Sequence, residues 1–315
     1  MEQKKLKNYI LNGSLHTLSI RSEGFVEDIQ EEVSNCISCS SRNTDAKSTV
    51  SVVNPNKLYG DVFKFSEFET VFSTILSGAG IKNYKLIRAD FRLDSYDPGH
   101  YQAYAKLNRY LISMLAVTYK TRNNYRTMDL FSQKQLSAAI KNDYFEAENY
   151  DRAAKSKITE NHDEPAQARL EERTISRSWR IAYSDYPEVV TDQDNMQLLK
   201  EEFTESWFNR WDKAIENVDL VHQKYNDQLE MIYKADKESY PTKFRSLTDF
   251  LIMYQGSIFC KSQMIDLLSR FEEVKDPKVR AENFKKRYGI EYFSKKDVHA
   301  AIDEVKRATK EFFDN

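Results

Sequence analysis

The chain has 315 residues, of which 40% are hydrophobic and 13% aromatic, so it has enough apolar material for a buried core. This composition excludes a disordered chain, and the 8 glycines and 6 prolines exclude a collagen-like or low-complexity one. The formal net charge of −2 does not mark a nucleic-acid binder, so the local distribution of charge matters more than the sum. No apolar run approaches the roughly 18 residues of a membrane span, and the N-terminus lacks a signal core. We expect a cytoplasmic protein without a membrane partner.

The cysteines and histidines form no recognisable metal-binding motif. Cys36 and Cys39 form a lone CxxC inside an expected polar loop at 34–48, and the sequence offers no second pair of ligands with similar spacing. His16 and the other histidines show neither H-x-H nor H-E-x-x-H spacing, so we expect surface or core histidines rather than ligands. The sequence also lacks the glycine-rich loops that cradle nucleotides, which argues against ATPase and dinucleotide chemistry.

The N-terminal part of the chain alternates strand and helix patterns. Period-two apolar residues predict strands at 15–20 and 49–53, and the segment NPNKL at 54–58 predicts a turn. A helix is expected to begin at Ser66, whose hydroxyl would cap it, and to end at Gly78.

The later part of the chain is more helical. A second helix is expected at 100–117, a strand at 125–131, and a polar helix or loop at 132–143. Beyond 195 strand signals are few, and the segment 247–271 breaks at Gly256 into two apolar-periodic helices. This outline is typical of a helix-turn-helix and also of helical bundles.

Three segments place charged side chains on one strand face and apolar side chains on the other. They are KLIRADFRLDS at 85–95, YFEAENYDR at 144–152 and QARLEER at 167–173. A half-solvated antiparallel sheet would explain each segment taken singly. Side by side, the three strands would gather a charged face, which comprises Arg88, Asp90, Arg92, Asp94, Glu146, Glu148, Tyr150, Arg169, Glu171 and Arg173.

The charged face has a chemical interpretation. Two or three carboxylates can hold a hard divalent cation, and a tyrosine can attack a phosphodiester that the cation polarises. The interleaved elements predict an α+β fold with a twisted, mainly antiparallel sheet, helices packed on one face and a helical C-terminal region. The charged face would then be the open one. We expect a catalytic domain at 1–185 and a helical domain at 195–315 that binds DNA or dimerises.

Two stretches are strongly basic despite the near-neutral total. Residues 101–141 carry seven basic side chains against one acidic, or +6, and residues 275–296 carry eight against three, or +5. Solvated helical faces would explain both. Because basic patches with interleaved aromatics also follow a phosphate backbone, we consider six candidates for DNA contacts: Lys120, Arg122, Arg126, Lys285, Lys286 and Arg287.

Several of these segments resemble, in the same order, motifs of the replication-initiation factor family of Gram-positive rolling-circle plasmids, which includes relaxases of some conjugative elements. NPNKL at 54–58 resembles the family's NPNKL element, and RADFRLD at 88–94 resembles its R-x-D-x-x-x-D strand. ENYDR at 148–152 is similar to its R-I-Y-(N/D)-K motif, and ARLEER at 168–173 to its R-V-E-x-E-L strand. The resemblance covers about residues 50–180.

The resemblance implies a homodimeric, metal-dependent DNA endonuclease and strand transferase that binds a replication origin and nicks one strand. Tyr150 would be the nucleophile and would remain linked to the DNA 5′ end until the transfer is reversed, while a host helicase unwinds from the nick. Mg²⁺ or Mn²⁺ would be held by Asp90, Asp94 and Glu171. The residues expected to offset charge on the phosphorus are Arg88, Arg92 and Arg169.

Some alternatives stay open from the sequence. Tyr125 and Tyr144 compete with Tyr150 as nucleophile, and Glu172 falls one place early in its motif, so it would face the opposite side of the sheet. A relaxase of a conjugative element, a non-catalytic origin-binding regulator, and a hydrolytic nuclease with a structural tyrosine are the alternative functions. The nicking hypothesis requires Tyr150 to be accessible and to face Asp90 and Glu171.

Overall fold

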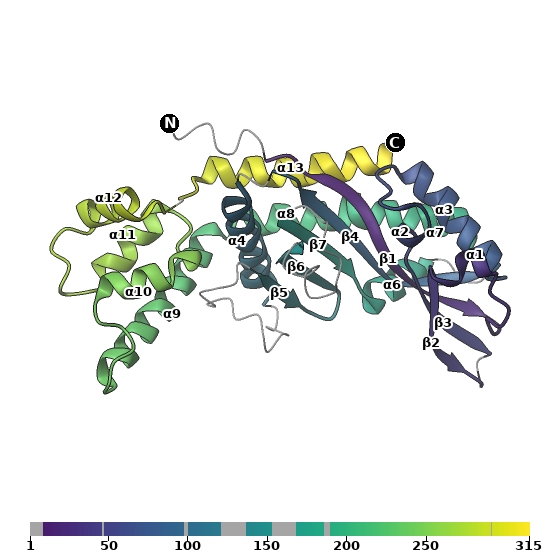
Figure 1. Cartoon of the computed structure of the whole chain (residues 1–315), viewed down its shortest axis with the longest axis horizontal. Coiled ribbons are helices and arrows are strands. Elements are labelled where there is room, and N and C mark those ends of the chain that lie inside the picture. Colours follow the sequence, from purple (N-terminus) through teal and green to yellow (C-terminus); the bar gives the residue numbers. More distant parts are fainter. Residues whose placement is uncertain are drawn as a thin grey trace.

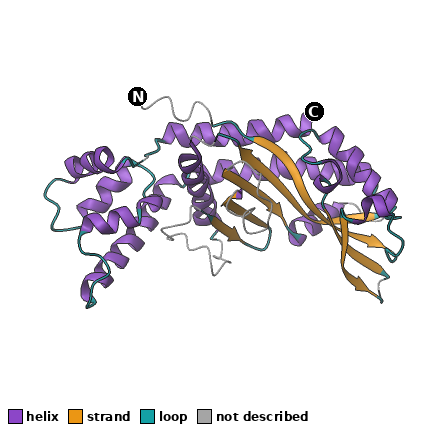
Figure 2. Cartoon of the chain, viewed as in Figure 1, coloured by secondary structure: helices purple, strands orange, loops and turns teal. Residues whose placement is uncertain are grey.

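A long antiparallel sheet organises the molecule, with helices packed along it and a further group of helices at one end (Figures 1 and 2). The computed structural model describes residues 9–45, 47–97, 100–120, 137–152, 168–185, 190–290 and 292–315. The strands are β1 (Asn12–Glu23), β2 (Ile37–Asn43), β3 (Ser48–Val53), β4 (Tyr84–Ser95), β5 (Ala138–Lys141), β6 (Phe145–Asp151) and β7 (Ala168–Thr174). They form one seven-stranded sheet in the order β2-β3-β1-β4-β7-β6-β5, and every described pairing is antiparallel. The predicted α+β class is confirmed.

The helices become dominant toward the C-terminus, as predicted. Up to residue 182 the described α-helices are α1 (Glu31–Ser34), α2 (Asn56–Tyr59), α3 (Phe65–Gly78), α4 (Tyr101–Tyr119) and α6 (Ser176–Ala182). The second half contains α7 (Asp192–Glu201), α8 (Trp207–Ile215), α9 (Val218–Glu238), α10 (Leu247–Met253), α11 (Lys261–Ser269), α12 (Pro277–Tyr288) and α13 (Lys295–Asp314). A π-helical segment, Glu202–Ser206, joins α7 to α8. Among the described residues, no helix combines the length and apolar character needed to cross a bilayer.

The apolar face of the central strands packs against aromatic side chains of the C-terminal helices. The ring of Phe91 on β4 lies 5.2 Å from that of Phe203 and 5.4 Å from that of Phe312, centroid to centroid. Phe145 on β6 lies 5.2 Å from Trp207 in an edge-on contact. Because successive side chains of a strand point to opposite faces, the same strands turn their charged residues away from these helices.

The packing changes later in the chain than the domain boundary predicted between 185 and 195. The helices α7, α8 and α13 follow that boundary, yet they pack with the sheet or with α3. The backbone N–H of Leu11, just before β1, donates to Glu304 of α13 at 2.8 Å. The helices α9–α12 form the group that extends to the other end of the molecule (Figure 1).

Three local expectations differ from the structure. Ser66 is the second residue of α3 and donates to the carbonyl of Asn315 at 2.5 Å, and Lys64 holds the N-cap position without a side-chain hydrogen bond. The segment 132–143, read as a polar helix or loop, contains strand β5, because pairing with β6 outweighs the helical propensity of its alanines. Cys39 lies in β2 rather than in a loop. The strand expected at 125–131 falls outside the described residues.

Candidate functional site

The three charged strands are neighbours in the sheet. β4 pairs with β7, and β7 pairs with β6. The register sets Asp90 of β4 opposite Arg173 of β7 and sets Asp94 opposite Arg169. Tyr150 of β6 lies on the other side of Arg169. The predicted adjacency of these three segments is confirmed.

The charged face is buried, and our expectation of an open face is wrong. Asp90, Arg92, Asp94, Arg169 and Glu171 are each, as whole residues, no more than 3% exposed. Buried charges are tolerated when they are paired and hydrogen-bonded. The arrangement of acids and bases on this face provides such pairs.

Asp94 belongs to a network of arginines. Arg169 donates to both carboxylate oxygens of Asp94 at 2.6 Å. Arg92 lies 3.7 Å from Asp94 and 2.5 Å from Asp61, an acid that the sequence did not single out. Since four residues of a strand span about 13 Å, one cation cannot contact both Asp90 and Asp94. The distance corrects the predicted role of Asp94 as a metal ligand beside Asp90. Arg92 and Arg169, which were predicted to offset charge on the phosphorus, are paired with carboxylates.

Asp90 is held by arginines on the same face. Arg88 donates to both of its carboxylate oxygens, at 2.7 and 2.8 Å, and Arg173 approaches within 3.7 Å. Burial raises the pKa of Asp90, and the negative charge of Glu171 adds to this, while the Arg88 hydrogen bond opposes it. A bound cation would satisfy the two crowded carboxylates.

A cluster of His16, Asp90 and Glu171 could hold that cation. One potential ligand atom from each residue lies within 4.8 Å of the others, and the residues come from the adjacent strands β1, β4 and β7. Two carboxylates and an imidazole suit Mn²⁺, and the carboxylates suit Mg²⁺. We refer to these three residues as the triad. It retains two of the predicted ligands, and His16 takes the place of Asp94.

The sequence did not identify His16 because it lies at an irregularity of β1. The pairing with β4 shifts between Leu15 and Thr17, so His16 is the extra residue of a β-bulge. As a result, His16 and Thr17 are both partly exposed while Leu15 and Leu18 are buried, three positions apart. That odd spacing between two core leucines was the available signal.

The imidazole of His16 is suited to ligation because it is neutral near pH 7. Burial lowers its pKa to about 4, with further lowering by Arg92 and other arginines, and the nearby Glu171 opposes this only in part. The Thr17 hydroxyl lies 2.9 Å from Nδ1 of His16. If the Thr17 hydroxyl accepts a hydrogen bond from Nδ1–H, Nε2 is left as the ligand atom.

Tyr150 meets neither requirement of the nicking hypothesis in full. The residue is only 7% exposed, which contradicts the expected accessibility. Its phenol is close enough to Glu171 for that carboxylate to influence its pKa, but the register places Tyr150 beside Arg169 and Asp94, four residues along β4 from Asp90. Burial and the charge of Glu171 raise the pKa of Tyr150, and Arg169 lowers it in part by donating to the phenol oxygen at 3.2 Å. Among its competitors, Tyr144 is 37% exposed with the Arg177 guanidinium 4.7 Å from its ring centre. Tyr125 lies outside the described residues.

The basic candidates for DNA contacts lie apart from the charged face. Lys120 is exposed at the C-terminal end of α4. Lys285, Lys286 and Arg287 form the last turn of α12, in the helical group at the far end of the molecule (Figure 1). The structure therefore brings none of these four onto the charged face. The remaining two, Arg122 and Arg126, are outside the described residues.

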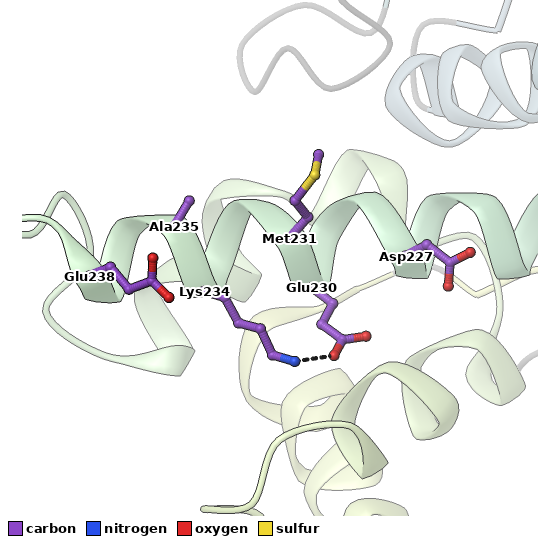
Figure 3. Close-up of a pocket in the computed structure, with 6 residues that line it drawn as sticks. All are labelled: Asp227, Glu230, Met231, Lys234, Ala235 and Glu238. Atoms are coloured by element: carbon purple, nitrogen blue, oxygen red, sulfur yellow. Dashed lines mark hydrogen bonds and ion pairs between the residues drawn. The ribbon is translucent and has the colours of Figure 1, made fainter.

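Two surface hollows lie elsewhere and carry no comparable chemistry. One follows α9, where Lys234 and Glu230 form an ion pair at 2.6 Å between helix-surface side chains (Figure 3). The other lies over α6 and is lined by Arg177, Arg180 and neighbours. Neither contains a member of the triad or Tyr150.

The chain matches no protein-family model, no curated protein and no solved structure. The geometry of the charged face and the order of the motifs in the sequence are therefore the observations that bear on function.

Proposed function

We propose that this protein is a rolling-circle replication initiator that cleaves and rejoins one DNA strand with the help of a divalent cation. The observation that carries the proposal is the triad, because His16, Asp90 and Glu171 offer three ligand atoms within 4.8 Å of one another. They lie on the sheet face that also carries Tyr150. The motif order in the sequence supports the same activity.

The triad would hold Mg²⁺ or Mn²⁺, which would polarise a non-bridging oxygen of the phosphodiester and offset its developing charge. The bidentate pair of Arg169 with Asp94 fixes the guanidinium that donates to the phenol oxygen of Tyr150. A hydrogen bond to that oxygen favours the phenolate, which is the nucleophilic form. Arg169 is thus suited to position and activate the tyrosine.

In the proposed reaction the phenol oxygen of Tyr150 bonds to phosphorus as the phenol loses its proton. The bond to the 3′ oxygen breaks, and that oxygen takes a proton to become a hydroxyl. Attack of a 3′ hydroxyl on the phosphotyrosine reverses the exchange, so rejoining needs no ATP. Because Tyr150 is 7% exposed, this mechanism requires the site to open when DNA binds.

The burial of Tyr150 specifically favours a second candidate, a hydrolytic nuclease. A water molecule would then be the nucleophile, and the tyrosine would serve to hold Arg169 in place. This candidate uses the same triad and differs in its product, which would be a free 5′ phosphate.

The proposal also includes binding of the protein to the replication origin. The basic last turn of α12 and Lys120 are suited to contacts with DNA phosphates, which would make binding strongly salt-dependent. The resemblance adds a homodimer and a host helicase as partners. A relaxase of a conjugative element would share this chemistry, and a non-catalytic origin-binding regulator would share only the binding.

The test is incubation of the protein with supercoiled plasmid carrying the DNA that surrounds its own gene, with Mn²⁺, Mg²⁺ or EDTA. We expect metal-dependent relaxation and a covalent protein–DNA adduct that Tyr150→Phe abolishes and Tyr144→Phe retains. A free 5′ phosphate and an active Tyr150→Phe variant would establish the hydrolytic candidate instead. Salt-sensitive binding without cleavage in any divalent metal would overturn both and leave the origin-binding regulator.

A further inference from the structure

Arg173 of β7 is surrounded by carboxylates from three strands. Its guanidinium lies 3.0 Å from Glu171 on its own strand and 2.8 and 3.4 Å from Glu148 and Glu146 on β6. The fourth acid, Asp90 of β4, is 3.7 Å away. We call these four acids the Arg173 cage.

The Arg173 cage and the triad share two residues, Asp90 and Glu171. Arg173 touches both of them at once, with a side chain that is only 11% exposed. A cation bound by the triad would therefore place its charge close to a buried guanidinium. In a poorly solvated site such like charges repel strongly, since little water screens them.

The charge balance of the cage is nearly closed without any added cation. Arg88 also pairs with Asp90, and Lys141 also pairs with Glu146. Counted over these ion pairs of the described residues alone, four carboxylates face three basic side chains, which leaves one negative charge. A divalent cation would reverse the sign to one positive charge, and moving Arg173 away from the cage would restore the balance.

We propose that Arg173 is a built-in cation that holds the ligands of the triad together and competes with a divalent metal for Asp90 and Glu171. This inference rests on the proposed function, because it takes the triad as the metal site. Arg173 lowers the affinity of the triad for metal and keeps its carboxylates in position while the site is empty of metal. Metal binding requires the guanidinium to move outward.

The experiment measures Mn²⁺ binding to the full-length protein by isothermal titration calorimetry and by the electron paramagnetic resonance signal of free Mn²⁺. Arg173→Met should bind Mn²⁺ about tenfold or more tightly than the wild type, because a repelling charge near the metal is removed. Arg173→Lys should stay close to the wild type. Arg177→Met, which removes an exposed arginine paired with Asp143, is the control for the loss of one positive charge.

Arg173→Met leaves buried acids without their partner, which can destabilise the fold. The double variant Arg173→Met/Glu148→Gln removes one acid with the arginine and leaves the triad intact. It should also bind Mn²⁺ more tightly than the wild type. Adding Glu171→Gln to this double variant should abolish the gain, which locates the metal at the triad.

The outcomes separate this inference from the proposed function. Binding by the wild type with unchanged affinity in both Arg173→Met variants would overturn the role of Arg173 and leave the metal site standing. No binding by any variant would overturn both. An equal gain in Arg177→Met, or a gain that survives Glu171→Gln, would also refute competition at the triad.

Discussion

From Ala89 to Ser95 the two faces of strand β4 are both buried and differ in what buries them. Phe91 and Leu93 are inaccessible to solvent on one face, and Arg92 and Asp94, their neighbours in sequence, are 1% exposed on the other. The apolar face is closed by aromatic rings of the C-terminal helices, and its burial contributes about 25 cal/mol per Å². The charged face is held by ion pairs, whose attraction is largely offset by the desolvation of the charges. The stability of the fold therefore comes mainly from the apolar face, and we infer that the charged face serves the proposed reaction.

The adjacent residues Glu171 and Glu172 give the sharpest test of this contrast, because they lie on opposite faces. Glu171→Gln should lower strand cleavage by about 1,000-fold through loss of a triad ligand. Glu172→Gln should leave cleavage unchanged, since its carboxylate accepts from the indole of Trp211 on α8 at 2.7 Å. Single-turnover cleavage of origin DNA measures both. Equal losses in the two variants would show that the effect is one of folding.

On the apolar face, Phe91→Ala should cost about 3–5 kcal/mol of unfolding free energy, because it leaves a cavity among the aromatic rings. Urea denaturation followed by circular dichroism measures the cost. Cleavage per folded molecule should stay at the wild-type level. A cost below about 1 kcal/mol would mean that this face does not dominate stability.

On the charged face, Arg169→Met alone should cost about 3–5 kcal/mol, because it leaves Asp94 buried without its partner. The double variant Asp94→Leu/Arg169→Met should recover most of that stability, since it removes both charges. A thermodynamic cycle from urea denaturation of the two single variants and the double variant measures this coupling. If the losses of the two single variants simply add up in the double variant, the two residues are not coupled, which would contradict the distinction between the faces.

The pH dependence of stability should report Glu172, a buried acid on the apolar face. Burial raises the pKa of Glu172 to about 8, although Trp211 and Arg210 oppose the rise. Because the folded state holds this proton more tightly than the unfolded chain, the contribution to stability is complete below pH 4.5 and is lost as pH rises toward 8. The loss approaches about 1.4 kcal/mol per pH unit within that window. Glu172→Gln should flatten this slope in urea denaturation at pH 5, 6.5 and 8, and an unchanged slope would refute the assignment.

The sequence predicts the faces of strands better than positions along them. Alternation assigned Asp90 and Glu171 to one face and Glu172 to the other, and the structure agrees. Alternation shows which face a residue occupies but not how far it lies from other residues on that face. Asp94 was therefore grouped with Asp90, although the two lie about 13 Å apart along the strand. Asp61, the partner of Arg92, comes from a loop far away in sequence, and no periodic pattern indicates such a contact.

The burial of the charged face could not be predicted from the sequence either. A row of charged residues on one face of a strand predicts a solvent-exposed face, because charged side chains are rarely buried without partners. Here the partners come from neighbouring strands, and the pairing of Asp94 with Arg169 depends on a register that single-strand patterns do not contain. The same limit applies to β5, whose short alanine-rich run becomes a strand through its pairing with β6.

The bulge at His16 separates the folding role of β1 from its proposed chemical role. Without that residue, Leu15, Thr17 and Leu18 would alternate strictly, and the leucines would keep their places in the core. A one-residue deletion would thus remove the first of the two irregularities in the pairing of β1 with β4 and remove the imidazole in the same step. The histidine is an insertion that the sheet accommodates, and the strand's own geometry gives no reason for it.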